Sequence, residues 1–582
     1  MKKCTTLLQY FLCTAILAAT YTIFPLATYA SFEKKGSVLV PIRTAAEQLN
    51  AKVDWNDLSR SVILLKGSHR LEVTIGSREA TLDGKLVDLQ NPVQLADSRT
   101  VVPLSLLTNF FGINGVWNEN EDKLMVLSKP LGVPMDYKAQ GVVNKNRAAY
   151  NLQLNLNENG ELIVQASISV DNLSEDSWIK IVFYMIPNVF TEENKSKLAH
   201  PEDYAEDSAQ FDMQEVLVNG QKAEFQLSMD TLSIPLKDTL NPKQNAQVSI
   251  SYKMKLSKVG NRIAWDGKDT YYLAQWYPML ATYQGGGWNK ADYYPIGESY
   301  HTTPSDFKLH YELPTGYSLI SSSDSDLRQG ISSGDIEVAQ VKELFAMIYK
   351  EKKMESRIVD GVELRVFQDM NDESDIQKAV TTAADAVQYF QQTFGKYPLK
   401  QLDIVMGSGT MEYPGIVTVS SLSAIGEHFY QTLVHEIAHQ WWYAVVSNDP
   451  FRESWLDEGI TQLSTFLFLY DQRGELEHPG MDKAQAKLVS LRQAGTPLYS
   501  NRLLTEDERT FPLACYSQPT LKLWDLFNHF GGMNTAKTFL GSYYDHYSFK
   551  QVNTKEFVKF TEAYFLVDDE FFKEWLNLNK VE

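Results

Sequence analysis

Two histidines and a glutamate at a defined spacing restrict the folds open to this chain of 582 residues. His435 and His439 are four residues apart in the segment Leu433–Trp442, and positions i and i+4 lie on one face of an α-helix. Both imidazoles can therefore bind one metal ion, with Glu436 placed to act as a general base. A catalytic zinc ion needs a third protein ligand, and Glu458 follows nineteen residues after His439. The spacing predicts two helices that meet at a single zinc ion.

Glu458 is the third ligand that the pattern favours, because an unpaired carboxylate at the start of an apolar helix is costly to bury. Two alternatives stay open. Glu458 could cap its helix or lie on the surface, with the adjacent Asp457 as the ligand. If Glu458 binds the metal, Asp457 is placed to orient His435 or His439 by a hydrogen bond.

Hydrophobic periodicity divides much of the chain into two regions of different structure. Apolar and polar residues alternate from Tyr150 onward, as in Leu152–Leu156 and Val248–Tyr252, which predicts a mostly antiparallel β domain over residues 147–350. After about residue 375 the period becomes helical, beginning with Ala379–Phe394. Residues 351–582 are therefore expected to form an α+β domain with a helical C-terminal half, within a multidomain α+β protein.

An internal repeat precedes the β-rich region. Its anchors recur with a displacement of 62 residues, and they are Val40–Arg43, Asp54–Asn56 and Val62–Leu64 in the first copy and Val102–Ser105, Val116–Asn118 and Leu124–Val126 in the second. Each copy predicts a strand end, a short helix, a turn and a β-hairpin, so residues 31–128 form a small α/β repeat module. Residues 129–146 contain several prolines and glycines and suit a linker.

This repeat resembles the bacterial surface module called the copper amine oxidase N-terminal-like domain, over about residues 36–128. His69 is the only histidine in that stretch, and no cluster of metal ligands accompanies it. We therefore expect a stalk, or a spacer that associates with the cell wall or cell surface, rather than a redox domain.

The N-terminus has the features of an export signal. Lys2 and Lys3 precede an apolar stretch that ends in the small residues Ala27–Ala30, which predicts a signal peptide over residues 1–30. An uncleaved membrane anchor is the alternative. Removal of the signal leaves Cys515 as the only cysteine, so we expect a secreted or surface-associated protein without disulfides. The net charge of −19 disfavours nucleic acid and anionic membranes as partners.

The zinc motif and a second segment together resemble the aminopeptidase N family of gluzincins. That family carries Gly-x-Met-Glu-Asn before its zinc helix, and here Gly409, Met411 and Glu412 occupy matching positions, with Tyr413 in place of the asparagine. A catalytic tyrosine follows the glutamate ligand by some sixty residues in the family, and Tyr516 lies 58 residues after Glu458. The resemblance covers about residues 147–582.

The resemblance implies a thermolysin-like catalytic domain, one zinc ion per chain and peptide substrates. It implies that Glu412, together with Gly409 and Met411, binds the free N-terminus of the peptide, and that Tyr516 hydrogen-bonds the developing oxyanion. Glu436 would act as the general base, and the chain would be an aminopeptidase. The alternatives are a thermolysin-like endopeptidase and a non-catalytic surface-binding protein with structural zinc.

Overall fold

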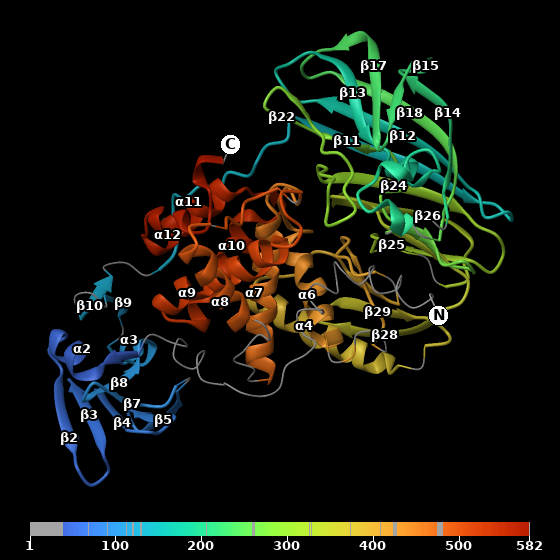
Figure 1. Cartoon of the computed structure of the whole chain (residues 1–582). Coiled ribbons are helices and arrows are strands. Elements are labelled where there is room, and N and C mark those ends of the chain that lie inside the picture. Colours follow the sequence, from blue (N-terminus) through green and yellow to red (C-terminus); the bar gives the residue numbers. More distant parts are fainter. Residues whose placement is uncertain are drawn as a thin grey trace.

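Three large hydrophobic cores follow one another along the chain, within residues 40–124, 148–348 and 359–576. The computed structural model describes residues 39–580 with gaps at 68, 90, 112, 119–121, 128–130, 205–206, 259–261, 325, 327–328, 373, 408, 423–425, 427, 474–480, 497 and 504. The expected signal over residues 1–30 lies outside this range. In Figure 1 the β-rich core (green) and the repeat module (blue) lie at opposite ends, with the helical core between them. The multidomain α+β architecture expected from the sequence is confirmed.

Each copy of the repeat folds into a strand, a short helix and a hairpin. The first copy comprises β1 (Leu39–Pro41), α2 (Ile42–Gln48), β2 (Lys52–Asn56) and β3 (Ser61–Lys66), and the second comprises β8 (Arg99–Pro103), α3 (Leu104–Phe111), β9 (Asn114–Asn118) and β10 (Lys123–Leu127). β1 pairs antiparallel with β8, so the two copies share a sheet. Three strands between them extend the β2–β3 hairpin into a five-stranded sheet, and they are β4 (His69–Thr74), β5 (Glu79–Leu82) and β6 (Lys85–Asp88).

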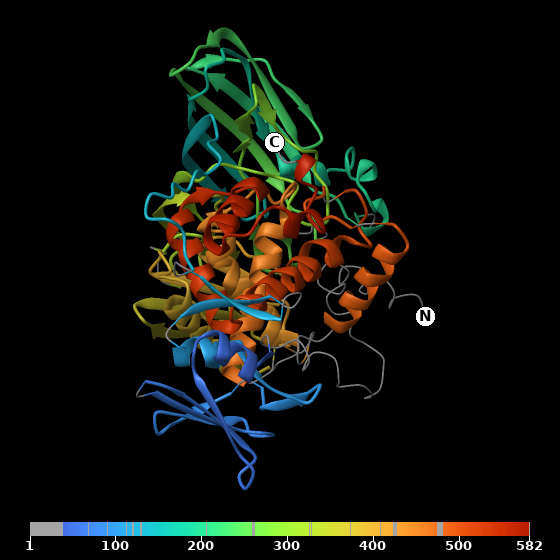
Figure 2. The same cartoon turned by 90° about the vertical axis from the view of Figure 1, so that its left-hand side faces the viewer.

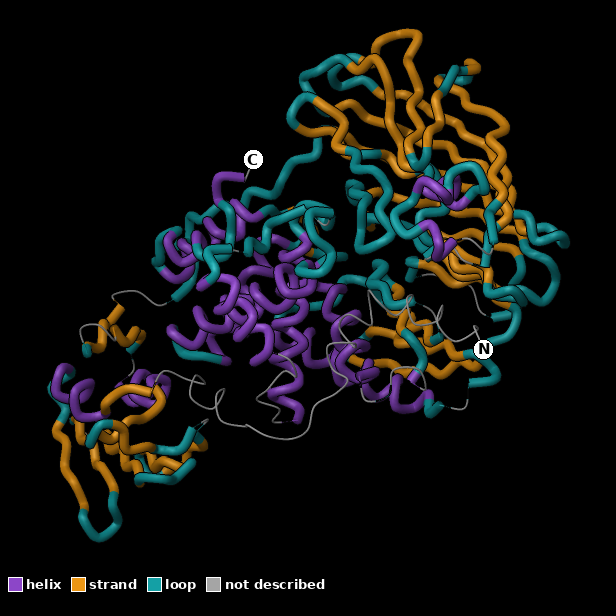
Figure 3. The backbone as a smooth tube through the Cα atoms, in the orientation of Figure 1, coloured by secondary structure: helices purple, strands orange, loops and turns teal. Residues whose placement is uncertain are grey.

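The second hydrophobic core is formed by residues of a twisted seven-stranded sheet and of the shorter sheets packed on it (Figure 3). The order is β15 (Gln221–Lys222), β14 (Gln210–Val218), β18 (Asn245–Lys255), β12 (Leu162–Asn172), β11 (Asn146–Leu156), β24 (Ser305–Glu312) and β26 (Ser333–Val341). Alternate residues of β11 and β12 are buried, as the period-two pattern predicts. Neighbours pair antiparallel except β11 and β24, which run parallel.

The third region begins with a four-stranded sheet and continues as helices. The sheet is formed by β28 (Lys353–Val359), β29 (Val362–Gln368), β30 (Gln401–Met406) and β31 (Ile416–Val419). Helices α4 (Ile376–Thr393) and α6 (His428–Trp442) pack together beside it, and α7 (Ser454–Arg473) packs on α6. The remaining helices used below are α9 (Gln518–His529), α10 (Met533–Tyr547) and α11 (Thr554–Phe565). No helix among the residues with described structure is long and apolar enough to span a bilayer.

Residues 131–145 connect the repeat module to β11 while packed against the C-terminal helices (Figure 2). The backbone N–H of Gly132 donates to the carbonyl of Tyr564, and that of Val142 donates to the carbonyl of Gln551. Between them, the Tyr137 hydroxyl lies 2.9 Å from the hydroxyl of Tyr547 in α10. We call residues 131–145 the strap, because they are bound along the surface of the C-terminal helices.

Candidate active site

The side chains of His435, His439 and Glu458 meet where α6 and α7 cross. The Nε2 atoms of the two histidines are 3.1 Å apart, and Oε2 of Glu458 lies 3.1 Å from His435 Nε2 and 3.3 Å from His439 Nε2. Zinc with ligands at about 2.0–2.1 Å in a tetrahedron has those ligands roughly 3.3 Å from one another. The three atoms therefore have the spacing of three corners of a zinc site, and the residues present fit the metal.

A threonine orients one of the histidines. The hydroxyl of Thr461 lies 3.1 Å from Nδ1 of His439, and both side chains are fully buried. A hydroxyl that accepts the Nδ1 proton leaves the Nε2 lone pair free for a metal ion. Asp457, the alternative ligand, is not part of the metal-ligand cluster, and its carboxylate accepts the backbone N–H of Glu458 instead. No motif or spacing in the sequence distinguishes Thr461 from the other apolar and hydroxyl residues of α7.

Glu436 lies beside the metal ligands on α6 and is almost completely buried. Burial raises the pKa of its carboxyl group, and the nearby negative charge of Glu412 raises it further. A carboxylate that holds a proton readily is suited to accept one from water and return it, which is the chemistry of a general base. Its role in this chain stays a prediction.

Tyr516 reaches the metal ligands from a single π-helical turn, residues Leu513–Ser517, immediately before α9. Its hydroxyl donates a hydrogen bond to Oε1 of Glu458, and its ring lies parallel to that of His435, with centroids 6.0 Å apart. A glycine permits this approach, because a Cβ on Gly459 would lie 2.4 Å from Cγ of Pro519. Pro519 is the residue that packs closest to Gly459.

The segment that carries Glu412 lies between β30 and β31 at the edge of the catalytic sheet. Met411 forms an antiparallel bridge with Thr418, and its side chain is buried in a small cluster that joins the β domain to this sheet. Gly409 is exposed, and its carbonyl accepts the hydroxyl of Thr418. Glu412 itself is buried, and its carboxylate lies within 4.8 Å of that of Glu458. Of the three predicted substrate-binding side chains, only that of Glu412 is thus placed at the metal ligands.

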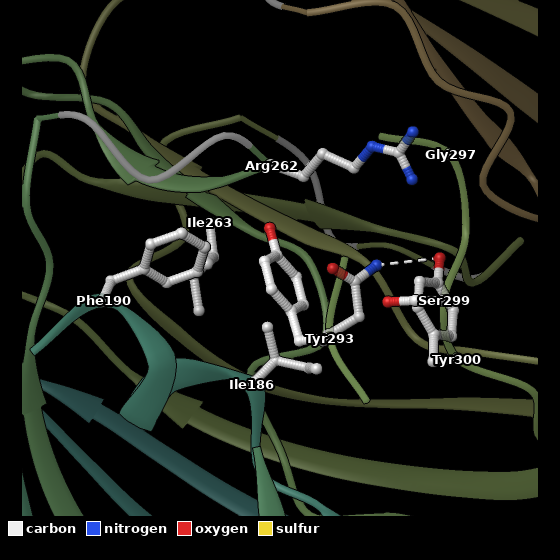
Figure 4. Close-up of a pocket in the computed structure, with 9 residues that line it drawn as sticks. Ile186, Phe190, Arg262, Ile263, Tyr293, Gly297, Ser299 and Tyr300 are labelled. Carbon is white, nitrogen blue, oxygen red and sulfur yellow. Dashed lines mark hydrogen bonds between the residues drawn. The ribbon is translucent and has the colours of Figure 1, made fainter. Parts of the chain in front are cut away.

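Glu298 is a fourth carboxylate at the site, and the sequence analysis missed it. Single carboxylate oxygens of Glu298, Glu412 and Glu458 all lie within 4.8 Å of one another. Glu298 comes from the β domain, where it binds Nη1 of Arg262 through its Oε1 at 2.6 Å. In Figure 4 the Arg262 side chain extends past the pocket lined by Phe190 and Tyr293 toward Gly297, the neighbour of Glu298. Glu298 lies in an irregular segment with neither periodicity nor a motif spacing, so no sequence signal singles it out.

Comparison with known proteins identifies the catalytic region. Residues 378–575 match the peptidase family M1 domain, and residues 24–126 match the copper amine oxidase N-terminal domain. The chain carries an M1 peptidase domain. Both resemblances expected from the sequence are confirmed, and the M1 family implies zinc at the cluster of His435, His439 and Glu458.

Curated relatives of the M1 domain include aminopeptidases. The chain is 33% identical over 115 residues to an alanine/arginine aminopeptidase of Saccharomyces cerevisiae, an alignment that covers 17% of this chain and 13% of the relative. It is 26% identical over 197 residues to leukotriene A-4 hydrolase of Xenopus laevis, and covers 32% of each protein. The chain thus spans about a third or less of the length of these relatives.

A solved structure shows the same fold over most of the chain. A single-site mutant of an M1 zinc metallopeptidase from Deinococcus radiodurans superposes with a TM-score of 0.55 at 16% identity, and the match covers 76% of this chain and 96% of the other. The likeness therefore extends well beyond the M1 domain into the β-rich region.

Negative charge is concentrated beside the metal ligands of the M1 domain. Burial raises the pKa of Glu412, and the neighbouring carboxylates of Glu298 and Glu458 raise it further, because like charges oppose ionisation. One guanidinium, that of Arg262, lies close enough to lower it. A site of this kind is stabilised by a bound cation, which can be a metal ion or a protonated amine.

Proposed function

We propose that this chain is a zinc aminopeptidase that releases the N-terminal residue of peptides. The observation that carries the proposal is the meeting of Glu298 and Glu412 with Glu458. Glu298 and Glu412 are buried, and each has a carboxylate oxygen within 4.8 Å of one of Glu458. The positive α-amino group of a peptide would bind there, next to the metal ligands and its own first peptide bond.

The chemistry follows from the positions of four side chains. His435, His439 and Glu458 would hold the zinc ion, which when bound would supply Lewis-acid chemistry. Glu436 is placed to accept a proton from the attacking water and to pass it to the leaving amine. Tyr516, whose hydroxyl now donates to Glu458, donates to the oxyanion as it forms.

The named relatives support peptide hydrolysis from the N-terminus, since one is an alanine/arginine aminopeptidase. A thermolysin-like endopeptidase is disfavoured, because an internal peptide segment brings no positive charge to compensate the buried Glu412, which lies close to the carboxylates of Glu298 and Glu458. A purely structural zinc site is also disfavoured. Such a site is closed by four protein ligands, whereas this cluster offers three with Glu436 and Tyr516 beside it.

A pair of peptides with free and acetylated N-termini tests the proposal. We expect the wild-type protein to cut the free peptide after its first residue and to cleave the acetylated one only slowly. Glu412→Ala should lower kcat/KM for the free peptide by about 10- to 100-fold, because a charge-assisted hydrogen bond contributes about 1.5–3 kcal/mol. Glu355→Ala, at an exposed position of β28, is the matched control. Efficient internal cleavage of the acetylated peptide would refute the aminopeptidase function.

A further inference from the structure

We propose that Gln440 is a positioning residue that holds Glu412 in register with the metal ligands, an inference that rests on the proposed aminopeptidase function. Gln440 follows His439 directly on α6 and is fully buried. Its Oε1 accepts the backbone N–H of Gly415 at 2.9 Å, and its Nε2 donates to the carbonyl of Tyr413 at 3.1 Å. The side-chain amide thus binds the chain on the C-terminal side of Glu412.

The backbone N–H of Gly415 depends on Gln440 more than the carbonyl of Tyr413 does. Among the described residues around Glu412, Met411 bridges to Thr418 and the carbonyl of Tyr413 also accepts the N–H of Ile416, whereas the N–H of Gly415 bonds to Gln440. Gln440 presents one donor and one acceptor with the spacing of a neighbouring strand. An unsatisfied buried amide group costs about 1–3 kcal/mol, so removal of this side chain favours a shift of the loop.

Other contacts hold the same loop to the β domain rather than to the metal helix. The ring of Tyr413 stacks on Phe345 at 4.2 Å between centroids. Gly415 has a φ of +75°, and a Cβ there would lie 2.8 Å from the carbonyl oxygen of Ser322. These contacts place the loop against the β domain, whereas Gln440 connects it to the residue next to a zinc ligand. Gln440 therefore sets the separation between the carboxylate that binds the amine and the metal that activates the peptide bond.

That separation decides which bond is cut. One residue of an extended peptide spans about 3.3–3.6 Å. If the amine site shifts by a fraction of this distance, the first peptide bond shifts by the same amount relative to the metal ligands. A misplacement of about 1 Å at a reacting centre costs roughly 100-fold in rate. Tyr413 replaces the asparagine of the family motif. Because Gln440 binds the main chain there, its contact does not depend on that side chain.

The test replaces Gln440 and separates amine recognition from metal binding. Gln440→Met has a similar length and removes both hydrogen bonds, and Gln440→Asn keeps an amide on a shorter stem. We expect Gln440→Met to retain zinc, to lower kcat/KM for free peptides by about 10- to 100-fold mainly through kcat, and to leave residual cleavage of acetylated peptides unchanged. Gln440→Asn should show a smaller loss, and it carries the test if the methionine variant does not fold. Gln368→Met removes another buried amide that binds backbone, and controls for the general cost.

A double variant shows whether Gln440 acts through Glu412. If it does, Gln440→Met adds no further loss of free-peptide kcat/KM in a Glu412→Ala background, because the two changes remove one interaction. Additive losses, an equal loss on acetylated peptides, or an unchanged kcat/KM in both Gln440 variants would overturn the inference. A wild-type protein that cuts free and acetylated peptides equally well would instead refute the aminopeptidase function, so the two failures are distinguishable.

Discussion

At the scale of single residues, the site combines three buried carboxylates, those of Glu298, Glu412 and Glu436, with the partly buried Glu458, and the four differ in their partners. Glu458 is bound by two imidazoles and by the Tyr516 hydroxyl, whereas Glu298 is bound by Arg262. Glu412 and Glu436 have raised pKa values, first because of burial and then because of neighbouring carboxylates. These different partners support the proposal that the group contains a metal ligand, an amine site and a base.

The role of Glu436 is tested by changing its charge while keeping its shape. We expect Glu436→Gln to bind zinc as the wild type does and to lose about 100- to 10,000-fold in kcat, because an amide cannot accept the proton of water. Zinc content by elemental analysis and initial rates on one free peptide measure the two effects. Glu458→Ala is the contrasting variant, since loss of a ligand should lower the zinc content itself. Near-normal turnover in Glu436→Gln would remove Glu436 from the mechanism.

At the scale of elements, the close packing of α7 against the start of α9 brings Tyr516 to the metal ligands. The π-helical turn adds one residue to the helical path, and single turns of this kind recur at functional sites. Gly459 has no side chain, and the ring of Pro519 occupies the space that a Cβ would need. The glycine that follows the third zinc ligand is therefore required by packing between helices.

Gly459→Ala tests this packing. The added methyl group must push α9 away, so we expect the free energy of unfolding to fall by about 1–3 kcal/mol and kcat to fall with it, as Tyr516 moves from Glu458. Urea unfolding and initial rates give the two quantities. Gly287→Ala is the control, because a Cβ at Gly287 meets open space. If Gly459→Ala left the free energy of unfolding and kcat unchanged, α9 would be able to move aside without displacing Tyr516.

At the scale of the whole molecule, the strap connects the repeat module to β11 and lies bound along the helices of the M1 domain. Tyr137 packs edge-on against Phe560 of α11, and Gln551 in the short strand β33 (Lys550–Gln551) receives two hydrogen bonds from the strap. β33 pairs with β32 (Val446–Ser447), which lies shortly after the zinc helix α6. The strap thus supports the helices behind the active site and belongs, by its contacts, to the catalytic core.

Two truncations distinguish the strap from the module. Deletion of residues 31–128 should leave kcat/KM and the urea midpoint of the catalytic core within error of the full chain, because no site residue comes from the module. Deletion of residues 31–145 should lower the midpoint, since it exposes apolar surface of α10 and α11. Tyr137→Ala in the full chain is the point variant, with an expected loss of about 1–2 kcal/mol. An inactive but folded protein after the first deletion would show that the module shapes the cleft.

The sequence by itself determined the features that depend on short spacing along one element. Backbone geometry converts such short spacings directly into structure. The examples here are the histidines at i and i+4 with the glutamate that follows them, the alternating strands and the repeat of 62 residues. The α+β architecture was predicted on this basis, whereas the peptidase domain and the repeat module were predicted from the resemblance of their motifs to known families, and all three are confirmed. The roles of Glu412, Glu436 and Tyr516 stay predictions.

Only the tertiary structure decided which distant residues complete the site. Glu298 and Arg262 come from the β domain, and Gln440 acts on a backbone segment 25 residues away from it in sequence. The hydroxyl of Thr461 contacts His439, although Asp457 was the residue considered for orienting His435 or His439. Thr461 lies three residues after Glu458, on the same face of α7, which is the face that crosses α6. Such contacts depend on how separate elements pack, and packing leaves no periodic trace in a single sequence.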